Sequence, residues 1–380
     1  MKILFLTRRF YPEVGGVEKH VLEISKRFVK RGHEVKIITE LGPDNQHSKK
    51  NDYQSIGQSD TQSINSKQPV KSIQSEHFEL GPVKVFRFKF GKDNWFKKFR
   101  IWATLFRNLN LITDADVVHC HDVFFWYLPF RFLFPGKKVF TTFHGYETYP
   151  LKFKNILIRK FSELLSYGTI CVGDFMKKWY FAKPDFVIYG GVNKIKSSKL
   201  PPKADQPLAE KIKSFNKNNS ALFIGRLDEQ TNIREYCSAV SKIKKKIPHF
   251  KFEIAGDGKF RSHAARFGKV LGFIKNPEDN FAEYRFAFVS RYLSILEAMA
   301  AKKLVFAMYD NPIKEDYLRM TPFASSIIIT DSPEDLADKI NFYLKNSEEE
   351  QKAIKKSYSW VKDKSWEEVV NIYQKLWSKR

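Results

Sequence analysis

The chain has 380 residues, of which 43% are hydrophobic and 28% are charged, and its formal net charge is +24. This length accommodates two domains of ordinary size, and the composition excludes an intrinsically disordered or fibrous chain. The three cysteines form no close pair in the sequence, which argues against a disulfide framework and favours a reducing, cytoplasmic environment.

The excess of positive charge is larger in the N-terminal half. Residues 1–200 hold 34 Lys and Arg against 18 Asp and Glu, whereas residues 201–380 hold 32 against 24. Nucleic acid, an anionic membrane face and anionic substrates are all candidate partners for such a chain. A Lys-rich surface that only keeps the protein solvated is the alternative.

The first elements predict a strand–helix–strand unit. Residues 2–7 form an apolar run typical of a buried strand, too short for the core of a signal peptide. Gly15 and Gly16 precede an amphipathic helix of about 16 residues that begins at Val17 and ends at Gly32. Residues 34–39 are the next strand, so parallel pairing is expected.

The two glycines leave two interpretations open. Amide groups of Gly15 and Gly16 at the start of a helix would attract an anion. A tight turn that only requires glycine is the alternative. The dinucleotide pattern G-x-G-x-x-G is absent here, so a nicotinamide cofactor is not supported.

Residues 43–77 are rich in Ser, Gln, Asn, Lys and Asp, and we expect a disordered insertion there. Strands are then predicted over residues 83–88, 116–119, 138–142, 168–172 and 186–189. A Lys/Pro/Ser-rich segment, roughly residues 194–203, is typical of a linker.

A second alternating series begins at residue 221. The predicted strands cover residues 221–224, 250–255, 269–271, 286–289, 303–307 and 326–329, and the predicted helices cover 232–246, 293–301, 333–345, 348–359 and 365–378. The fold class is therefore α/β, with two halves that each contain a parallel sheet. The longest aromatic run, residues 123–134, is about half of a membrane span, so no transmembrane helix is expected.

Three histidines stand at strand ends. Alternation places His119 and His121 on one face at the carboxyl end of a strand, and His144 follows another strand. Open α/β sheets keep their binding sites at this edge, which favours a cleft. A metal site is not expected, because no second cluster with ligand spacing accompanies these residues.

A basic and aromatic segment covers residues 84–107, which hold eight basic and eight aromatic side chains against one acid, Asp93. Trp95, Phe99, Trp102 and Phe106 recur at helical spacing. The pattern is typical of a helix that rests on an anionic membrane, and equally of a helix that packs this stripe on the core. Single-stranded nucleic acid is a weaker alternative, since no nucleic-acid module signature is present.

Eight short blocks, in order, resemble the glycosyltransferases of family 4 with the GT-B fold, and only residues 43–77 lie outside the resemblance. The blocks are residues 10–20 with 31–35, 116–121, 142–145, 190–193, 225–227, 256–258, 271–273 and 296–300. The resemblance implies two Rossmann-like domains that face a cleft: an acceptor domain (1–192), a nucleotide-sugar domain (193–364) and a final helix (365–380) that returns to the first domain.

The same resemblance implies a retaining hexosyltransferase that uses a nucleotide-sugar donor, no metal and no other cofactor. His119 or His121 would lie near the reacting sugar. His144 and Glu147 would lie on the acceptor side. Donor contacts would come from Gly15, Gly16, Gly225, Arg226, Gly256, Asp257, Arg291, Ser294 and Glu297. Arg226 would stabilise the negative charge that grows on the leaving diphosphate, and Glu297 would bind ribose hydroxyls.

Two positions depart from the family pattern. The Lys expected five residues after Arg226 is Thr231, and the first glutamate of the usual pair is replaced by Val289. Arg291, which precedes a helix N-terminus, is a candidate for the missing positive charge.

Three hypotheses follow. The first is a glycosyltransferase of the cell envelope, cytoplasmic and peripheral on the inner face of the plasma membrane, with a glycan or lipid-linked acceptor. The second is a GT-B protein that binds nucleotide sugar without turnover. The third, a nucleic-acid-binding protein, is less favoured, and strongly salt-dependent binding to single strands would identify it.

Overall fold

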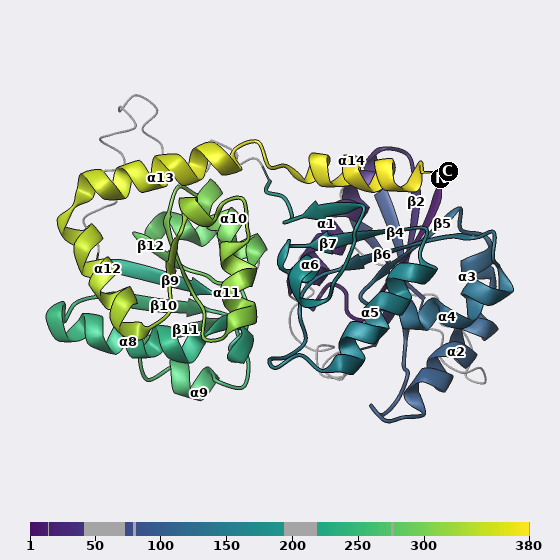
Figure 1. Ribbon diagram of the computed structural model, residues 1–380, viewed down its shortest axis with the longest axis horizontal. Helices are drawn as coiled ribbons and strands as arrows, with labels where there is room; N and C mark the ends of the chain where they lie inside the picture. The colour runs from purple at the N-terminus through teal and green to yellow at the C-terminus, as the bar shows by residue number, and fades with distance from the viewer. Residues whose placement is uncertain (14, 42–72, 79–80, 194–218, 275–276, 380) are drawn as a thin grey trace.

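The computed structural model describes residues 1–13, 15–41, 73–78, 81–193, 219–274 and 277–379 (Figure 1). The predicted insertion, except its last five residues, and the predicted linker lie outside these residues. Residues 73–77, expected within the insertion, instead belong to strand β3.

The N-terminal sheet has the order β3-β4-β2-β1-β5-β6-β7-β8. Its pairs are parallel except for β3, which runs antiparallel to β4 at one edge. The strands are β1 (Lys2–Thr7), β2 (Glu34–Glu40), β3 (Ile73–Phe78), β4 (Gly81–Phe88), β5 (Val117–His121), β6 (Lys138–Phe143), β7 (Gly168–Val172) and β8 (Phe186–Ile188).

In the described part of the first half of the chain, the helices beside this sheet are α1 (Gly16–Lys30), α2 (Lys97–Arg107), α3 (Asn110–Thr113), α4 (Phe124–Leu133), α5 (Phe153–Leu165) and α6 (Phe175–Trp179). In α1, Val21, Ile24 and Phe28 share one face, are fully buried and join the core against the sheet. Gly32, with φ of 80°, allows the chain to turn into β2.

The C-terminal sheet is entirely parallel in the order β11-β10-β9-β12-β13-β14. Its strands are β9 (Ser220–Ile224), β10 (Lys251–Ala255), β11 (Lys269–Gly272), β12 (Phe286–Phe288), β13 (Leu304–Met308) and β14 (Ile328–Thr330). The helices are α8 (Ile233–Lys246), α9 (Arg261–Ala264), α10 (Tyr292–Ala300), α11 (Pro312–Arg319), α12 (Pro333–Lys345) and α13 (Ser347–Val361). The expected start of α12 is confirmed, because Ser332 accepts a hydrogen bond from the Asp335 amide at 3.3 Å.

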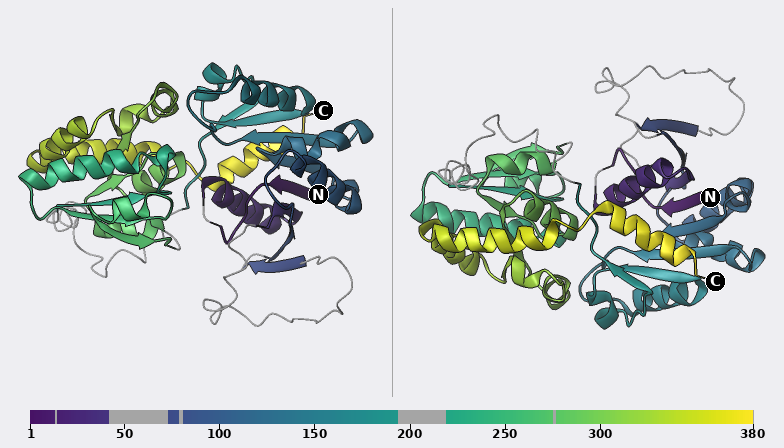
Figure 2. Two further views of the ribbon diagram at one scale, coloured as in Figure 1. Left: turned by 90° about the horizontal axis from the view of Figure 1, so that it is seen from below. Right: turned by 90° about the horizontal axis from the view of Figure 1, so that it is seen from above.

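The last helix, α14 (Trp366–Trp377), lies on the N-terminal sheet rather than on the C-terminal one. It contacts α1, β7 and β8, and the right-hand view of Figure 2 shows it beside α1. The chain therefore crosses between the sheets twice, and buried residues from both halves belong to one continuous core cluster.

Two parallel-sheet α/β halves were expected, and the structure confirms them. Within the part of the chain that the structure describes, none of the helices combines the length and hydrophobicity needed to cross a membrane.

Candidate functional site

The loop after β9 presents Arg226. Its guanidinium is half exposed and is held within the loop, with Nε 3.2 Å from Asp228 and Nη2 donating to Gln230 at 3.1 Å. The Thr231 hydroxyl donates to the carbonyl of Arg226 at 2.5 Å and also contacts that of Asp228 at 3.0 Å. Thr231 thus closes the loop, in the place where the family pattern has a lysine.

Two predicted glycines make a close approach behind this loop. A Cβ on Gly256 would overlap the carbonyl oxygen of Gly225. The amide of Gly225 donates to Ala255, and that of Leu227 donates to the Asp257 carbonyl. Gly256 therefore allows the turn after β10 to support the Arg226 loop.

Asp257 does not join Arg226. Its Oδ1 accepts from the Gly258 amide at 2.7 Å, and its Oδ2 pairs with Arg261 at 2.7 Å. Both side-chain oxygens of Asp257 are therefore engaged within the turn after β10, and its contact with a donor stays a prediction.

The N-terminus of α10 contributes a second cation. Arg291 is its N-cap residue, and the guanidinium lies over the ring of Tyr317 at 5.3 Å. Its Nη1 atom is buried and makes no hydrogen bond. Ser294 turns back and donates to the carbonyl of Arg291 at 3.0 Å, so its hydroxyl stabilises this helix start.

Lys314 of α11 is fully buried beside Arg291. Its ammonium donates to the carbonyls of Ser290 at 2.5 Å and Gln230 at 3.2 Å. Burial first, and then the charge of Arg291, hold the pKa of Lys314 well below its usual range. Lys314 therefore ties the Arg226 loop to the start of α10.

These C-terminal elements meet the segment after β6 of the N-terminal half. The Gln230 amide donates to the carbonyl of Glu147 at 2.9 Å. A Cβ on Gly145 would lie 3.4 Å from Nη2 of Arg291. Arg291 thus lies beside the segment that begins at His144, and Arg226 reaches the same segment through Gln230, each from one of two neighbouring strand ends.

Glu297 is engaged from the opposite half. Its Oε1 lies 2.7 Å from the ammonium of Lys19 in α1, and the Glu297 side chain is only 10% exposed. The predicted ribose ligand is therefore paired with a cation that the sequence analysis did not identify.

The start of α1 holds another unexpected acid. Gly15 is the N-cap in extended conformation, and a Cβ there would overlap the carboxylate of Glu18. Gly16 faces open space. Burial first raises the pKa of Glu18, while Arg9 and Arg226 act in the opposite direction. A carboxylate thus occupies the helix N-terminus at which an anion was expected.

His119, one of the two histidines predicted near the reacting sugar, is enclosed in the structure. It is fully buried, Nε1–H of Trp377 donates to its Nδ1 at 3.0 Å, and its Nε2 lies 2.7 Å from the Thr142 hydroxyl. Because indole is only a donor, the proton of neutral His119 resides on Nε2 and is donated to Thr142. The alternation of side chains along β5 correctly placed His119 and His121 on one face of the strand, but it did not predict how deeply His119 is buried.

The other histidines continue this cluster toward the surface. His121 Nδ1 lies 2.8 Å from Nε2 of partly exposed His144, and His121 Nε2 is buried without a partner. His20 contacts the Tyr373 hydroxyl at 2.9 Å. Burial holds the pKa of all four histidines below the usual value, that of His144 at about 3. His121 is therefore a neutral group behind His144, not an exposed base.

Glu147 acts as a clamp. Its carboxylate accepts from Arg159 at 2.9 Å and from the Tyr180 hydroxyl at 2.5 Å. These two hydrogen bonds fix the segment that Arg226 and Arg291 approach. The side chain of Glu147 is therefore already engaged before any acceptor binds. Among the described residues, no three His, Cys, Asp or Glu side chains are arranged to hold a metal ion.

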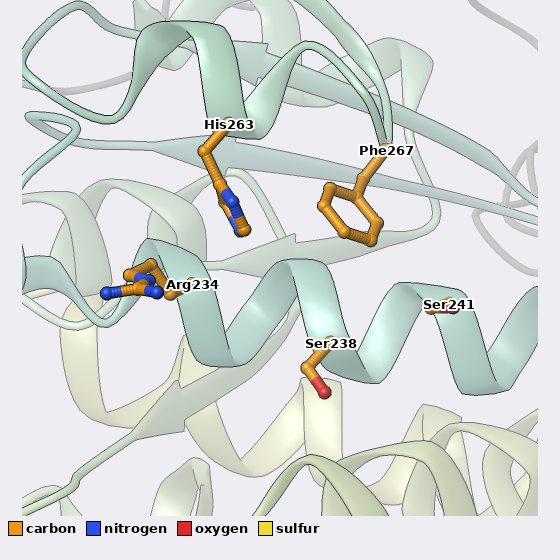
Figure 3. Close-up of a pocket in the computed structure, with 5 residues that line it drawn as sticks. All are labelled: Arg234, Ser238, Ser241, His263 and Phe267. Carbon is orange, nitrogen blue, oxygen red and sulfur yellow. The ribbon is translucent and has the colours of Figure 1, made fainter.

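A separate depression lies between α8 and α9 (Figure 3). It is lined by Arg234, Ser238, Ser241, His263 and Phe267, none of which belongs to the site above. This depression is therefore not part of the candidate site around Arg226, Arg291 and Glu297.

The sequence analysis missed Glu18, Lys19, Gln230 and Lys314. Lys314 carried one signal, because Asn311-Pro312 is a helix start that follows a strand, and the Asn311 side chain indeed accepts from the Lys314 amide at 2.9 Å. The others act through partners far away in the sequence, for which local patterns give no signal.

Comparison with known families agrees with this arrangement. Residues 14–194 match the family described as Glycosyltransferase Family 4, and residues 218–346 match Glycosyl transferases group 1. Together these two segments cover most of the chain.

A shorter similarity links the chain to a curated protein of Campylobacter jejuni. This is GalNAc-alpha-(1->4)-GalNAc-alpha-(1->3)-diNAcBac-PP-undecaprenol alpha-1,4-N-acetyl-D-galactosaminyltransferase, and the identity is 36% over 91 residues. The match covers 23% of this chain and 25% of that protein.

Solved structures share the fold over the full length. Anabaena HepE, in complex with UDP and glucose, has a TM-score of 0.67 and 14% identity and covers 100% of both chains. A mutant of S. aureus TarM, in complex with fondaparinux, alpha-GlcNAc-glycerol and UDP, has a TM-score of 0.67 and 13% identity and also covers 100% of both chains. At such identities the likeness shows the fold alone.

Proposed function

Because the chain belongs to the glycosyltransferases of family 4 with the GT-B fold, we propose that it transfers a sugar from a nucleotide-sugar donor, with retention of configuration, to a lipid-linked or polysaccharide acceptor of the cell envelope. One observation carries the proposal. Arg226 and Arg291 come from two strand ends and approach the same segment, residues 144–147, Arg226 through Gln230 and Arg291 directly beside Gly145.

Two guanidinium groups suit a diphosphate. In our proposal Arg226 forms charge-assisted hydrogen bonds to the donor diphosphate, and Arg291 supplies the second charge in place of the absent lysine. Arg291 has a buried, unpaired Nη1 atom, which a phosphate oxygen would satisfy. Charge that develops on the leaving diphosphate would be stabilised by these preformed cations without a metal.

The nucleoside would lie over α10. Glu297 is the ribose ligand in this proposal, and the donor displaces Lys19 from it. Two carboxylate oxygens can accept from two vicinal hydroxyls. His144, the partly exposed histidine, takes the acceptor side, and His121 orients it through the 2.8 Å contact.

A peripheral membrane location belongs to the same proposal. The Campylobacter relative acts on an undecaprenol-linked glycan, as its name states. In this chain the aromatic stripe of residues 84–107 is turned outward, because Trp95, Phe99 and Phe106 are exposed whereas Ile101 and Leu105 of α2 are buried. The exposure of Trp95 and Phe99 supports the membrane alternative for this stripe, whereas the ring of Phe106 also lies 4.7 Å from that of the buried Phe130.

Donor binding tests the assignment directly. A thermal-shift screen of nucleotide sugars should identify one donor class, after which Arg226→Ala should weaken its affinity by about 10- to 100-fold. Arg291→Ala should weaken it by about tenfold. Arg266→Ala removes an exposed arginine that contacts His263, and as a matched control it should leave donor affinity unchanged. If Arg291→Ala behaves like this control while Arg226→Ala abolishes binding, Arg291 is not the replacement cation.

The second candidate is a binding protein without turnover. It is favoured by Thr231, which closes the loop where the family has a lysine, and by Val289, which is fully buried in place of the first glutamate. Release of nucleoside diphosphate across a broad acceptor panel separates the two functions. A donor that binds without any release would establish the second.

A further inference from the structure

The exposed hydrophobic side chains are distributed very unevenly. In the described residues, all large exposed hydrophobics except Phe273, Phe342 and Tyr358 lie before residue 182. Most of these lie on α2, α4 and α5 or directly beside them. Large apolar groups gathered on one face mark an interaction surface.

Helix α5 carries the most exposed part of this face. Phe153, Leu157, Phe161 and Leu164 recur at the spacing of one helical face, and Phe161 and Leu164 are 61% and 77% exposed. The opposite face of the same helix buries Arg159 and Ser162. The outward stripe of α5 is therefore as apolar as a packed face, yet nothing in the described chain covers it.

Helices α2 and α4 extend the face. The ring of Trp102 lies 5.1 Å from that of Phe125, and the ring of Phe106 lies 4.7 Å from that of Phe130. Helix α4 also contacts α5, and Figure 1 shows the three helices on the same side of the N-terminal domain. We call the outward sides of α2, α4 and α5 the apolar–basic face.

The charge of this face identifies its partner. Helices α2 and α4 contain no acidic residue, and the one acid of α5, Glu163, pairs with Lys160 at 2.7 Å. Lys98 lies 4.4 Å from the ring centroid of Trp95, and Lys154 and Arg107 are exposed. Aromatic rings interleaved with cations match the headgroup region of an anionic bilayer.

A second copy of the chain fits less well. In a self-complementary contact, the face that carries Lys98, Arg107 and Lys154 would meet an identical face of the partner. Like charges in such an interface are unfavourable. Anionic phosphates remove this repulsion, so the bilayer is the favoured occupant.

The apolar–basic face also adjoins the candidate site. Helix α4 begins three residues after β5 ends at His121, and the segment from His144 leads directly into α5. The exposed rings of Phe125 and Phe153 therefore stand at the helix ends that are nearest to the carboxyl edge of the sheet. A lipid-linked acceptor would reach this edge from the headgroup layer.

We propose that the apolar–basic face binds an anionic membrane, with Phe161 and Leu164 of α5 entering the boundary of the acyl chains. This inference rests on the proposed function for its acceptor, and it extends the membrane contact from residues 84–107 to α4 and α5.

The test is co-sedimentation of the full chain with vesicles of phosphatidylcholine, with and without about one-third phosphatidylglycerol. Wild type should pellet with the anionic vesicles, and high salt should weaken this binding. Phe161→Glu/Leu164→Glu should lower the partition coefficient by about tenfold or more. Phe273→Glu/Phe342→Glu, which changes two exposed rings of the C-terminal half, is the matched control and should pellet like wild type.

The basic contribution is tested with Lys98→Glu/Arg107→Glu. Lys97 and Arg100 are kept, because Lys97 pairs with Glu40 at 2.7 Å and Arg100 donates to the Phe90 carbonyl at 2.7 Å. The variant should lose binding to anionic vesicles at low salt.

Equal pelleting of wild type and the α5 variant would overturn the proposal. It would also be overturned if light scattering showed that the α5 variant changes only the oligomeric mass, since the face would then bind a second copy. Vesicle binding without nucleotide sugar separates this proposal from the sugar-transfer proposal. If the chain binds vesicles but releases no nucleoside diphosphate, the membrane proposal stands and the sugar-transfer proposal fails. If it releases nucleoside diphosphate but does not bind vesicles, the sugar-transfer proposal stands and the membrane proposal fails.

Discussion

Thr231 shows how one side chain replaces a ligand-binding role by a structural one. Its hydroxyl bonds two carbonyls of the Arg226 loop, and the residue is only 3% exposed. In our proposal Arg291 supplies the positive charge that the family pattern places at this position. Arg291 interacts electrostatically with Asp228 of the same loop, and the buried Lys314 donates to the carbonyl of Gln230.

We expect Thr231→Val to destabilise the fold by about 1–3 kcal/mol, because the carbonyls of Arg226 and Asp228 lose the buried Thr231 hydroxyl that bonds them. Thr231→Ser keeps the hydroxyl and should cost less than about 1 kcal/mol. Urea unfolding measures both. Equal losses for the two variants would show that the methyl group, not the hydroxyl, matters.

Gly256→Ala should be more harmful than most surface changes. Its Cβ would overlap the carbonyl oxygen of Gly225, so the Arg226 loop must move. We expect a loss of about 2–4 kcal/mol in unfolding free energy together with weaker donor binding. Gly136→Ala, where a Cβ meets nothing within 4 Å, is the control and should leave thermal unfolding unchanged.

At the scale of elements, the strands were the predictable part. Apart from β3, the strands of the two sheets contain short apolar runs, and most predicted bounds agree with the structure within two residues. Helix α11 was missed because charged residues interrupt its eight positions, and only Ile313, Tyr317 and Leu318 are its buried apolar residues. Strand β3 was missed because its composition resembles the polar segment before it.

The site was less predictable than the fold. The resemblance supplied Arg226 and Glu297, and the position before a helix N-terminus supplied Arg291. The partners that position these residues are remote in the sequence, as between Gln230 and Glu147, 83 residues apart. The burial of the histidines could not be predicted from the sequence either. His119 and His121 share a face, and only the packing of α14 in the structure shows that His119 is enclosed.

The hydrogen bonds of α14 to the N-terminal domain should stabilise the fold. Trp377→Phe removes the donor to His119, and Tyr373→Phe removes the hydroxyl that links Thr142 to His20. We expect each to cost about 1–3 kcal/mol. Lys375→Ala, on the exposed side of α14, should be neutral. If it were as harmful as the other two changes, the loss would not be specific to the buried hydrogen bonds.

For the whole molecule, the buried histidines predict acid sensitivity. Burial holds the pKa of His20, His119, His121 and His144 below the usual value. The unfolded chain therefore binds more protons below about pH 6.5, so the stability is fully present above that pH and is lost as the pH falls. Each histidine contributes a slope of about 1.4 kcal/mol per pH unit.

Thermal unfolding between pH 7.5 and 5.0 checks this expectation. The unfolding midpoint should fall steeply below about pH 6.5. His119→Gln should reduce the slope, whereas His249→Gln, a change at an exposed histidine, should not. A midpoint that is constant over this range would contradict the neutral cluster.

The ion pair between Lys19 and Glu297 has a consequence for donor affinity. Because the pair joins α1 to α10 across the domain boundary at 2.7 Å, a donor that binds Glu297 must displace Lys19, and breaking the pair lowers the affinity for the donor. Lys19→Met should therefore tighten donor binding in a calorimetric titration, and it should also weaken the contact between the two domains.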